Sequence, residues 1–285
     1  MANAAKQVPE NVPGDFFVDT TCIDCDACRQ IAPAVFGEAR ETSFVRRQPV
    51  TPEDRQAAVH ALLSCPTGSI GCRGNDNVKA AMRDFPLVIE HPVYYCGFNS
   101  PKSYGGNAYF IRHPDGNWLV DAPKFISPLV KRLEEWGGVD DIFLTHRDDV
   151  ADADRFAAHF AARRIIDRRE LDSQPDAEIV LEGDESTRIA EDFLAIPTPG
   201  HTEGHCCLLF AGRFLFTGDH LSWSRDRHRL SASRSYCWYS WDEQQRSMQR
   251  LAQHRFEWIL PGHGQRVQLS ADRMAAEMDA LVERM

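Results

Sequence analysis

The feature that most constrains this chain is the segment Cys22-Ile23-Asp24-Cys25-Asp26-Ala27-Cys28, in which two C-x2-C steps follow each other. Such spacing brings three thiolates around one small turn, where their sulfurs can converge on a single inorganic centre. A fourth ligand must come from elsewhere in the chain, and Cys65, which Pro66 follows, is the obvious supplier. The expected ligands are therefore Cys22, Cys25, Cys28 and Cys65.

The number of such cysteine runs indicates the kind of centre. In ferredoxins with two clusters, the Cys-Pro beside one run binds the other cluster, but this chain has only one C-x2-C-x2-C run. We therefore expect one cluster, of the [4Fe–4S] type. The alternative is a zinc site or a set of free thiols. Zinc sites usually pair two C-x2-C knuckles, whereas this chain has a triple, so the cluster is favoured.

The surrounding segment agrees with this interpretation. About residues 14–72 resemble the single-cluster bacterial ferredoxins, on the cysteine run, on Ile31-Ala32-Pro33 and on Cys65-Pro66-Thr67-Gly68-Ser69-Ile70. Thr51 as N-cap and Pro52 at the first helical position predict a helix start. An apolar stripe at helical spacing follows, so this helix would deliver Cys65 to the cluster.

After Pro86 the pattern changes, which predicts two domains, residues 1–85 and 86–285. Asn75-Asp76 is expected to cap a short helix between them. Short runs rich in β-branched and aromatic residues follow, and helices and strands alternate from residue 127. The expected fold class is α+β. The strands expected in the second half include Asp141–His146, Phe193–Pro197, Cys206–Phe210 and Arg213–Thr217.

Four short segments of the second domain place a His or Asp at or just beyond a strand end. Three imidazoles and a carboxylate are the ligand types that suit Zn or Fe. Loops at a sheet edge are where such sites are commonly built. The segments are Leu144-Thr145-His146, Thr198-Pro199-Gly200-His201-Thr202-Glu203-Gly204-His205, Phe216-Thr217-Gly218-Asp219-His220 and Pro261-Gly262-His263-Gly264.

Taken together and in this order, these segments resemble the metallo-β-lactamase superfamily over about residues 87–285. The resemblance implies an αββα sandwich with a one- or two-metal site at one edge. It matches His146 to the first His of the family's H-x-H-x-D-H motif and His201 to the His of the T-P-G-H-T loop. Asp219 matches the metal-bridging Asp, and His263 matches the His of the late P-G-H-G.

The chain departs from the family motif after His146. Asp148 stands where the second His would be, Val150 where the Asp would be and Ala151 where the last His would be. Asp148 could still bind a metal, as a carboxylate does in the related flavodiiron proteins. Because ligands of the second metal are missing, we expect one ion, Zn or Fe, rather than two. The alternative is a decayed site whose histidines only hold loops together.

Three functions are compatible with this sequence. The first is a metal-dependent hydrolase, in which a bound metal lowers the pKa of its water toward about 7 and Asp152 or Asp149 orients that water or accepts its proton. The second is an iron-dependent oxidoreductase that the cluster supplies with single electrons. The third is a non-catalytic redox or assembly scaffold. The family resemblance favours the hydrolase.

Composition limits the partners. The net charge of −10 argues against a nucleic-acid-binding role, which needs a basic surface. Met1 to Phe17 has no apolar core of a secretory signal, and no run approaches the roughly 20 apolar residues of a membrane-spanning helix. We therefore expect a cytoplasmic location, reduced cysteines, and a small-molecule substrate or a redox partner protein.

Overall fold

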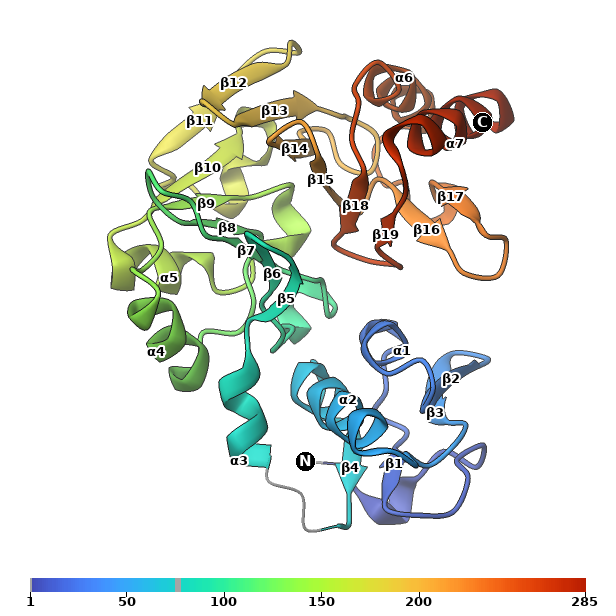
Figure 1. Cartoon of the computed structure of the whole chain (residues 1–285). Coiled ribbons are helices and arrows are strands. Elements are labelled where there is room, and N and C mark those ends of the chain that lie inside the picture. Colours follow the sequence, from blue (N-terminus) through green and yellow to red (C-terminus); the bar gives the residue numbers. More distant parts are fainter. Residues whose placement is uncertain (1, 75–77) are drawn as a thin grey trace.

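The computed structural model describes residues 2–74 and 78–285 (Figure 1). The N-terminal residues, in blue, form one unit, and the short helix α3 (Val78–Ala81) leads from it to a larger unit. The helix cap expected at Asn75-Asp76 lies outside the described residues.

The N-terminal unit is built from two short strand pairs and two helices around its own core. Thr51 caps the longer helix as expected, because its hydroxyl accepts a hydrogen bond from the Asp54 amide at 3.1 Å. That helix ends at Ser64 and so places Cys65 directly after its last turn. The elements are β1 (Phe16–Val18) paired with β4 (Ile70–Cys72), β2 (Phe36–Ala39) paired with β3 (Thr42–Val45), and helices α1 (Ala27–Ile31) and α2 (Pro52–Ser64).

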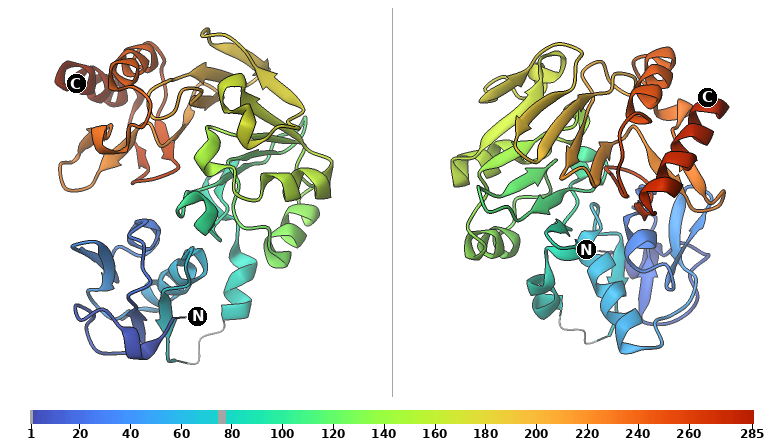
Figure 2. Two further views of the ribbon diagram at one scale, coloured as in Figure 1. Left: turned by 180° about the vertical axis from the view of Figure 1, so that it is seen from behind. Right: turned by 45° about the horizontal axis from the view of Figure 1, so that its top comes forward.

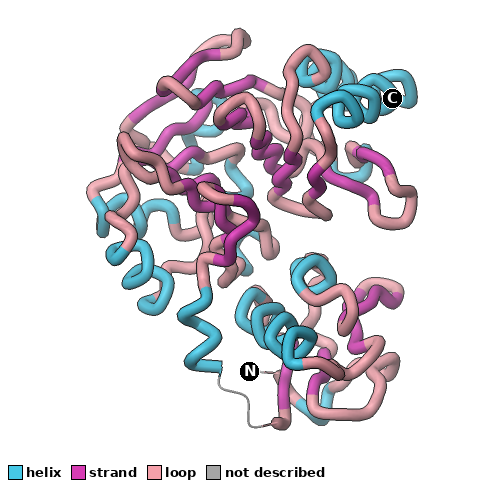
Figure 3. Tube along the Cα trace, viewed as in Figure 1, coloured by secondary structure: helices cyan, strands magenta, loops and turns pink. Residues whose placement is uncertain are grey.

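Two sheets face each other in the larger unit (Figures 2 and 3). The first runs in the order β11-β10-β9-β8-β7-β6-β5 and the second in the order β12-β13-β14-β15-β18-β19. The first sheet consists of β5 (Leu87–Glu90), β6 (Val93–Tyr95), β7 (Tyr109–Ile111), β8 (Trp118–Val120), β9 (Asp141–Phe143), β10 (Arg163–Asp167) and β11 (Ile179–Leu181). The second consists of β12 (Thr187–Ala190), β13 (Phe193–Pro197), β14 (Cys206–Phe210), β15 (Phe214–Gly218), β18 (Trp258–Pro261) and β19 (Val267–Gln268).

Helices cover the outer face of each sheet. Helices α4 (Ser127–Glu135) and α5 (Ala153–Phe160) pack on the first sheet through Leu133 and Phe156. Helices α6 (Trp241–Leu251) and α7 (Ala271–Arg284) bury Met248, Leu251, Met274 and Met278 on the second. The hairpin of β16 (Ser222–Ser224) and β17 (Arg229–Ser231) lies beside α7 and β18. The layers are thus αββα, and the expected fold class is confirmed.

The two units are in contact. Among the described residues, the buried core of the smaller unit ends at Ala81 and that of the larger unit begins at Phe85. Phe85, expected at the end of the first domain, thus packs with the second, and the exact boundary stays a prediction. Ile31 and Leu63 of the smaller unit pack against the larger core. None of the described helices has the length and apolar composition that a bilayer-spanning helix needs.

Candidate functional site

The four predicted cluster cysteines lie close together in the N-terminal domain, three in the 22–28 segment and Cys65 after helix α2. Cys25 interacts electrostatically with Cys65 and Cys22, and Cys28 with Cys25 and Cys22, so the four thiols face one another. Burial, reinforced by these neighbours, raises the pKa of Cys25 to about 12. Keeping Cys25 as a thiolate therefore requires positive charge beside it, which the irons of a cluster supply.

Backbone groups already point at the sulfurs. The Ser43 amide donates to Cys22 Sγ at 3.4 Å and the Ser69 amide donates to Cys65 Sγ at 3.3 Å. Buried Arg29 pairs with the carboxylates of Asp24 at 2.5 Å and Asp26 at 2.6 Å. These two aspartates have positive φ angles of 57° and 64°, so the ion pairs stabilise a tightly wound loop.

The predicted metal ligands of the larger domain lie at one edge of the two sheets. His146 and Asp148 follow β9, His201 follows β13, Asp219 follows β15 and His263 follows β18. Strands β15 and β18 are parallel, as are β8 and β9, so residues after their carboxyl ends meet at the same edge. Strand β9 ends at Phe143 rather than at His146, which puts this histidine on a loop.

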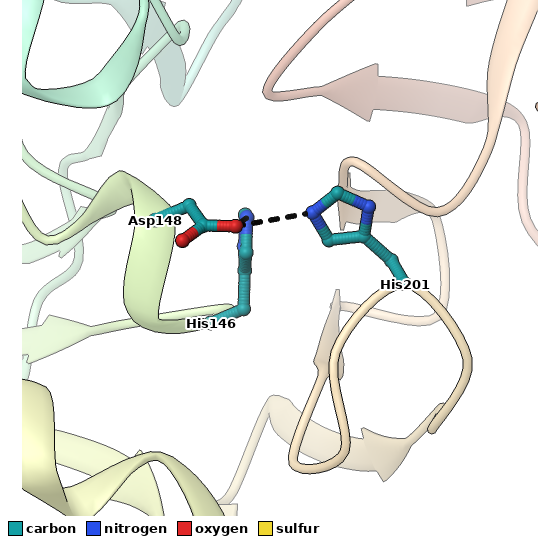
Figure 4. A group of neighbouring side chains, drawn as sticks. All are labelled: His146, Asp148 and His201. Atoms are coloured by element: carbon teal, nitrogen blue, oxygen red, sulfur yellow. Dashed lines mark ion pairs between the residues drawn. The ribbon is translucent and has the colours of Figure 1, made fainter. Parts of the chain in front are cut away.

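One group of donor atoms converges on a single point (Figure 4). His201 Nε2 lies 3.5 Å from Asp148 Oδ2, and His146 Nε2 lies 4.0 Å from the same oxygen. Asp219 Oδ2 lies 3.7 Å from His201 Nε2 and 3.9 Å from His146 Nε2. These separations suit four ligands around one ion at about 2.0–2.2 Å from each donor.

A second group shares Asp219 with the first. His263 Nε2 lies 3.9 Å from Asp219 Oδ2 and 3.9 Å from Asp149 Oδ1. Asp149 also joins His146 and Asp219 in a set whose ligand atoms lie within 4.8 Å of one another. From the sequence, Asp149 is a candidate catalytic residue and not a predicted metal ligand. Asp149 thus replaces a donor that the departure from the family motif had removed.

The imidazoles of His146 and His201 are held so that Nε2 faces the centre. Thr145 donates its backbone and hydroxyl groups to the buried carboxylate of Asp121 at 2.8–3.0 Å, and its hydroxyl lies 2.9 Å from His146 Nδ1. His201 Nδ1 hydrogen-bonds the carbonyl of Tyr236. A partner on Nδ1 fixes the ring orientation and leaves Nε2 for a metal.

Burial without a neutralising charge shifts the pKa values of the ionisable groups at this centre. Burial lowers the pKa of His146 to about 4 in spite of Asp219, so this ring is neutral. Burial also raises the pKa of Asp121 to about 8 and that of Asp149 well above its ordinary range, and the nearby Asp219 adds to both shifts. Several carboxylates share a buried space that only cations can make favourable.

The chemistry of the donors fits metal ions. In the described part of the chain, the buried atoms without a hydrogen-bond partner include His146 Nε2, His201 Nε2, Asp219 Oδ1 and both oxygens of Asp149. A buried polar atom without a partner costs free energy, so an ion that binds all of these atoms would stabilise the site. Three carboxylates and three imidazoles are ligands that iron or zinc accepts.

Asp152, the other predicted catalytic carboxylate, lies outside both groups. It accepts from Lys102 Nζ at 2.6 Å and from the Phe125 amide at 2.9 Å, and Arg155 lies 3.6 Å away. These contacts hold the 147–153 loop against its neighbours. A catalytic role for Asp152 stays a prediction, and the geometry around Asp149 suits that role better.

Glu170 is a supporting residue that the sequence did not reveal. Its fully buried carboxylate accepts from Arg147 Nε at 2.5 Å and from the Gly204 amide at 2.6 Å. It therefore ties the loop of His146 to the loop of His201. Glu170 lies in a six-residue 3-10 turn among charged residues, so no motif or periodicity marks it in the sequence.

The family model of the "Metallo-beta-lactamase superfamily" matches residues 103–263, which is more than half of the chain and includes every candidate metal ligand described above. The chain belongs to the metallo-beta-lactamase superfamily. The model "4Fe-4S single cluster domain of Ferredoxin I" matches residues 18–72, which include the four cysteines. Both resemblances inferred from the sequence are confirmed.

Curated relatives match only part of the chain. A hydroxyacylglutathione hydrolase of Salmonella paratyphi B is 29% identical over 127 residues, which is 43% of this chain and 50% of that enzyme. The chain thus spans about half the length of the curated relatives it matches.

Solved structures show the same fold. The metallo-beta-lactamase FIM-1 from Pseudomonas aeruginosa in its mono-zinc form superposes with a TM-score of 0.51 at 17% identity, over 69% of this chain and 93% of that one. The DIM-1 metallo-beta-lactamase gives a TM-score of 0.50 at 17% identity, over 69% and 95%. This likeness supports the fold of the larger domain.

Proposed function

We propose that this chain is a metal-dependent hydrolase whose N-terminal domain carries a [4Fe–4S] cluster. The observation that carries the proposal is the convergence of six donor residues that follow four strand ends. Among the described residues, buried donor atoms of four of them, His146, Asp149, His201 and Asp219, have no hydrogen-bond partner. Structural histidines that only hold loops together would be expected to use these atoms in hydrogen bonds.

We assign two ions to this centre, in place of the single ion expected from the sequence. On the distances between their donor atoms, His146, Asp148, His201 and Asp219 would hold one ion, and Asp149, Asp219 and His263 would hold the other. A metal ion in such a site lowers the pKa of a coordinated water toward about 7 and so supplies hydroxide for hydrolysis.

The chain's own groups then orient the reactants. Asp149 is buried at the centre and faces both His263 and Asp219. We assign to its other carboxylate oxygen, Oδ2, the orientation of the attacking water and the temporary holding of its proton. Exposed Tyr104 stands 6.5 Å from the His263 ring, and exposed Trp238 stands 6.1 Å from the His201 ring. These rings would contact the apolar part of a substrate.

The substrate class that we propose is an acyl thioester. The curated relatives of this chain include hydroxyacylglutathione hydrolases. The compound in that name, hydroxyacylglutathione, is an acyl thioester. An aromatic rim beside the metal ligands suits an acyl group with apolar surface.

The test is hydrolysis by the full chain loaded with Zn or Fe, on thioester, ester and phosphodiester substrates. We expect thioester turnover that falls by at least about 100-fold in Asp219→Ala, since even partners of ligands contribute 10–100-fold. The matched control is Asp226→Ala, which removes an exposed carboxylate elsewhere on the surface. Absence of turnover on all substrates by fully loaded protein would contradict the proposal, as would equal turnover by Asp219→Ala.

A further inference from the structure

The loop of residues 100–106 lies between the two sites. It contains the 3-10 turn η3 (Pro101–Ser103) and ends in Gly105-Gly106. A Cβ added to Gly105 would come within 2.7 Å of Cys25 Cβ and 3.1 Å of Cys25 Sγ. A Cβ added to Gly106 would come within 2.5 Å of Asp149 Oδ1. Two consecutive residues therefore touch a cluster cysteine on one side and a metal-centre carboxylate on the other.

A second contact links the same loop to the metal centre. His263 Nε2 lies 3.2 Å from the carbonyl oxygen of Ser103, and the Asn107 amide donates to the Gly262 carbonyl at 2.8 Å. The loop is also closed on itself, because the Gly105 amide donates to the Ser100 carbonyl at 2.8 Å. It is a fixed connection between the sites rather than a free surface loop.

The cluster side is fixed to the larger domain as well. Lys124 Nζ donates to the carbonyl of Pro66 at 2.7 Å, next to Cys65. Arg225 pairs with Asp26 at 3.4 Å, beside Cys25. Cys25 is thus held against Gly105 by contacts on both flanks of the cysteine loop.

We propose that residues 103–106 are the electron-transfer contact between the cluster and the metal centre. The reduced cluster gives up one electron and returns to its oxidised form, and one ferric ion at the metal centre becomes ferrous. No bond or proton is exchanged, and an external one-electron donor reduces the cluster again. The inference rests on the proposed binding of ions by the centre, with iron as the acceptor, and does not require hydrolysis.

The alternative is that the loop only docks the two domains. Rates of electron transfer fall steeply with the separation of the redox centres, so a contact that serves transfer must keep them close. Gly105 is the position to change, because its φ of +89° and its approach to Cys25 both exclude a side chain. Gly183 has a φ of +88° with no atom within 4 Å of an added Cβ, so Gly183→Ala reproduces the backbone strain without the contact.

The first experiment measures proximity in the unaltered full chain. The metal centre is loaded with paramagnetic Co²⁺ or with diamagnetic Zn²⁺, and the cluster is reduced with dithionite. We expect the EPR signal of the reduced cluster to relax faster and broaden with Co²⁺ and to remain unperturbed with Zn²⁺. Identical signals from two samples whose metal content is verified would overturn the proposal.

The second experiment measures transfer. Protein loaded with ferric iron receives less than one equivalent of dithionite, and the recovery of cluster absorbance is followed together with the appearance of ferrous iron. We expect one ferrous ion for each cluster reoxidised, a lower rate in Gly105→Ala, and an unchanged rate in Gly183→Ala. No transfer in the unaltered chain, or equal rates in all three proteins, would overturn the proposal. If Gly105→Ala loses its cluster, the comparison of Co²⁺ with Zn²⁺ in the unaltered chain still decides whether the two centres are close enough for transfer.

Discussion

The two inorganic sites of this molecule are built in opposite ways. In the N-terminal domain, three of the four cysteines lie within residues 22–28, and one helix brings in Cys65. In the larger domain, the donors follow four different strands, β9, β13, β15 and β18. A local site can be recognised from spacing, whereas a dispersed site depends on the topology that brings strand ends together.

The two sites also differ in what the protein itself supplies. Cys22 and Cys65 receive backbone hydrogen bonds from Ser43 and Ser69, and Arg29 neutralises the aspartates of the loop. Within the described part of the chain, neither oxygen of Asp149 has a hydrogen-bond partner. The protein therefore satisfies the polar groups of the cysteine loop in part by itself. At the proposed metal centre, bound ions would have to supply the neutralising charge and the missing partners.

The largest expected effect separates the two sites completely. Cys25→Ser should remove the cluster, because a ligating thiolate is lost, while Zn or Fe at the metal centre remains. Iron and sulfide analysis with visible spectroscopy measures the loss. Cys237→Ser is the control, since this thiol belongs to the larger domain and donates to the Gly200 carbonyl at 3.1 Å. Full retention of iron and sulfide in Cys25→Ser would contradict the assignment.

The next prediction distinguishes the two carboxylates of the 147–153 loop. Asp149→Asn should lower the number of ions bound at the metal centre from two to one, because it replaces a ligand oxygen of the second group. Asp152→Asn should leave both ions in place and weaken only the contact to Lys102. Metal analysis after dialysis measures both. Loss of an ion in Asp152→Asn with none lost in Asp149→Asn would reverse our assignment.

The third prediction concerns pH. Burial alone would lower the pKa of His201, but Asp148, Asp219 and the Tyr236 carbonyl outweigh it and raise the pKa above its ordinary value. A metal needs the neutral imidazole, so metal affinity should fall as the pH drops through this raised pKa. The pKa of His146 is about 4, so protons should not compete with the metal for this imidazole until far lower pH.

Zn²⁺ dissociation constants of cluster-containing protein between about pH 5 and about pH 8 measure this effect. Asp148→Asn removes a carboxylate that raises the pKa of His201, so it should weaken binding overall and shift the decline to lower pH. An affinity that does not change over this range would show that His201 is not a ligand.

The smallest effect is expected away from both sites. The Arg164 guanidinium holds the pKa of Glu178 down at about 2. Because the pKa is depressed on folding, this pair stabilises the protein above the ordinary carboxyl pKa and loses its effect as the pH falls toward about 2. The Glu178 side chain is 40% exposed and solvent screens the pair, so Glu178→Gln should change the free energy of unfolding by about 1 kcal/mol or less at neutral pH. Chemical denaturation measures it, and a much larger loss would show a role beyond this pair.

Sequence reasoning recovered the parts of the fold that depend on local pattern. The cap at Thr51 and the strands Phe193–Pro197 and Cys206–Phe210 are present as predicted. Strand β12 and the hairpin β16–β17 were not predicted, because their short and largely polar sequences show no clear alternation.

The candidate site was predictable only where a local sequence pattern marks its residues. His146, His201, Asp219 and His263 stand in motifs, and the structure brings them together with Asp148. The position of Asp149 depends on the 3-10 turn η4 (Arg147–Asp149), which turns consecutive carboxylates toward different donor groups. The contact of Gly105 with Cys25 joins residues 80 positions apart in different domains, and no spacing in the sequence predicts it.

The central claim is that this chain holds two different inorganic sites side by side. Metal and sulfide analysis of anaerobically purified full-length protein, incubated with Zn²⁺ and then dialysed, tests it most directly. We predict iron and sulfide in the proportions of one [4Fe–4S] cluster per chain together with two further ions, the cluster absent in Cys25→Ser and the further ions absent in Asp219→Ala. Protein that carries iron and sulfide but binds no further ion, or whose ion content is unchanged in Asp219→Ala, would contradict the claim.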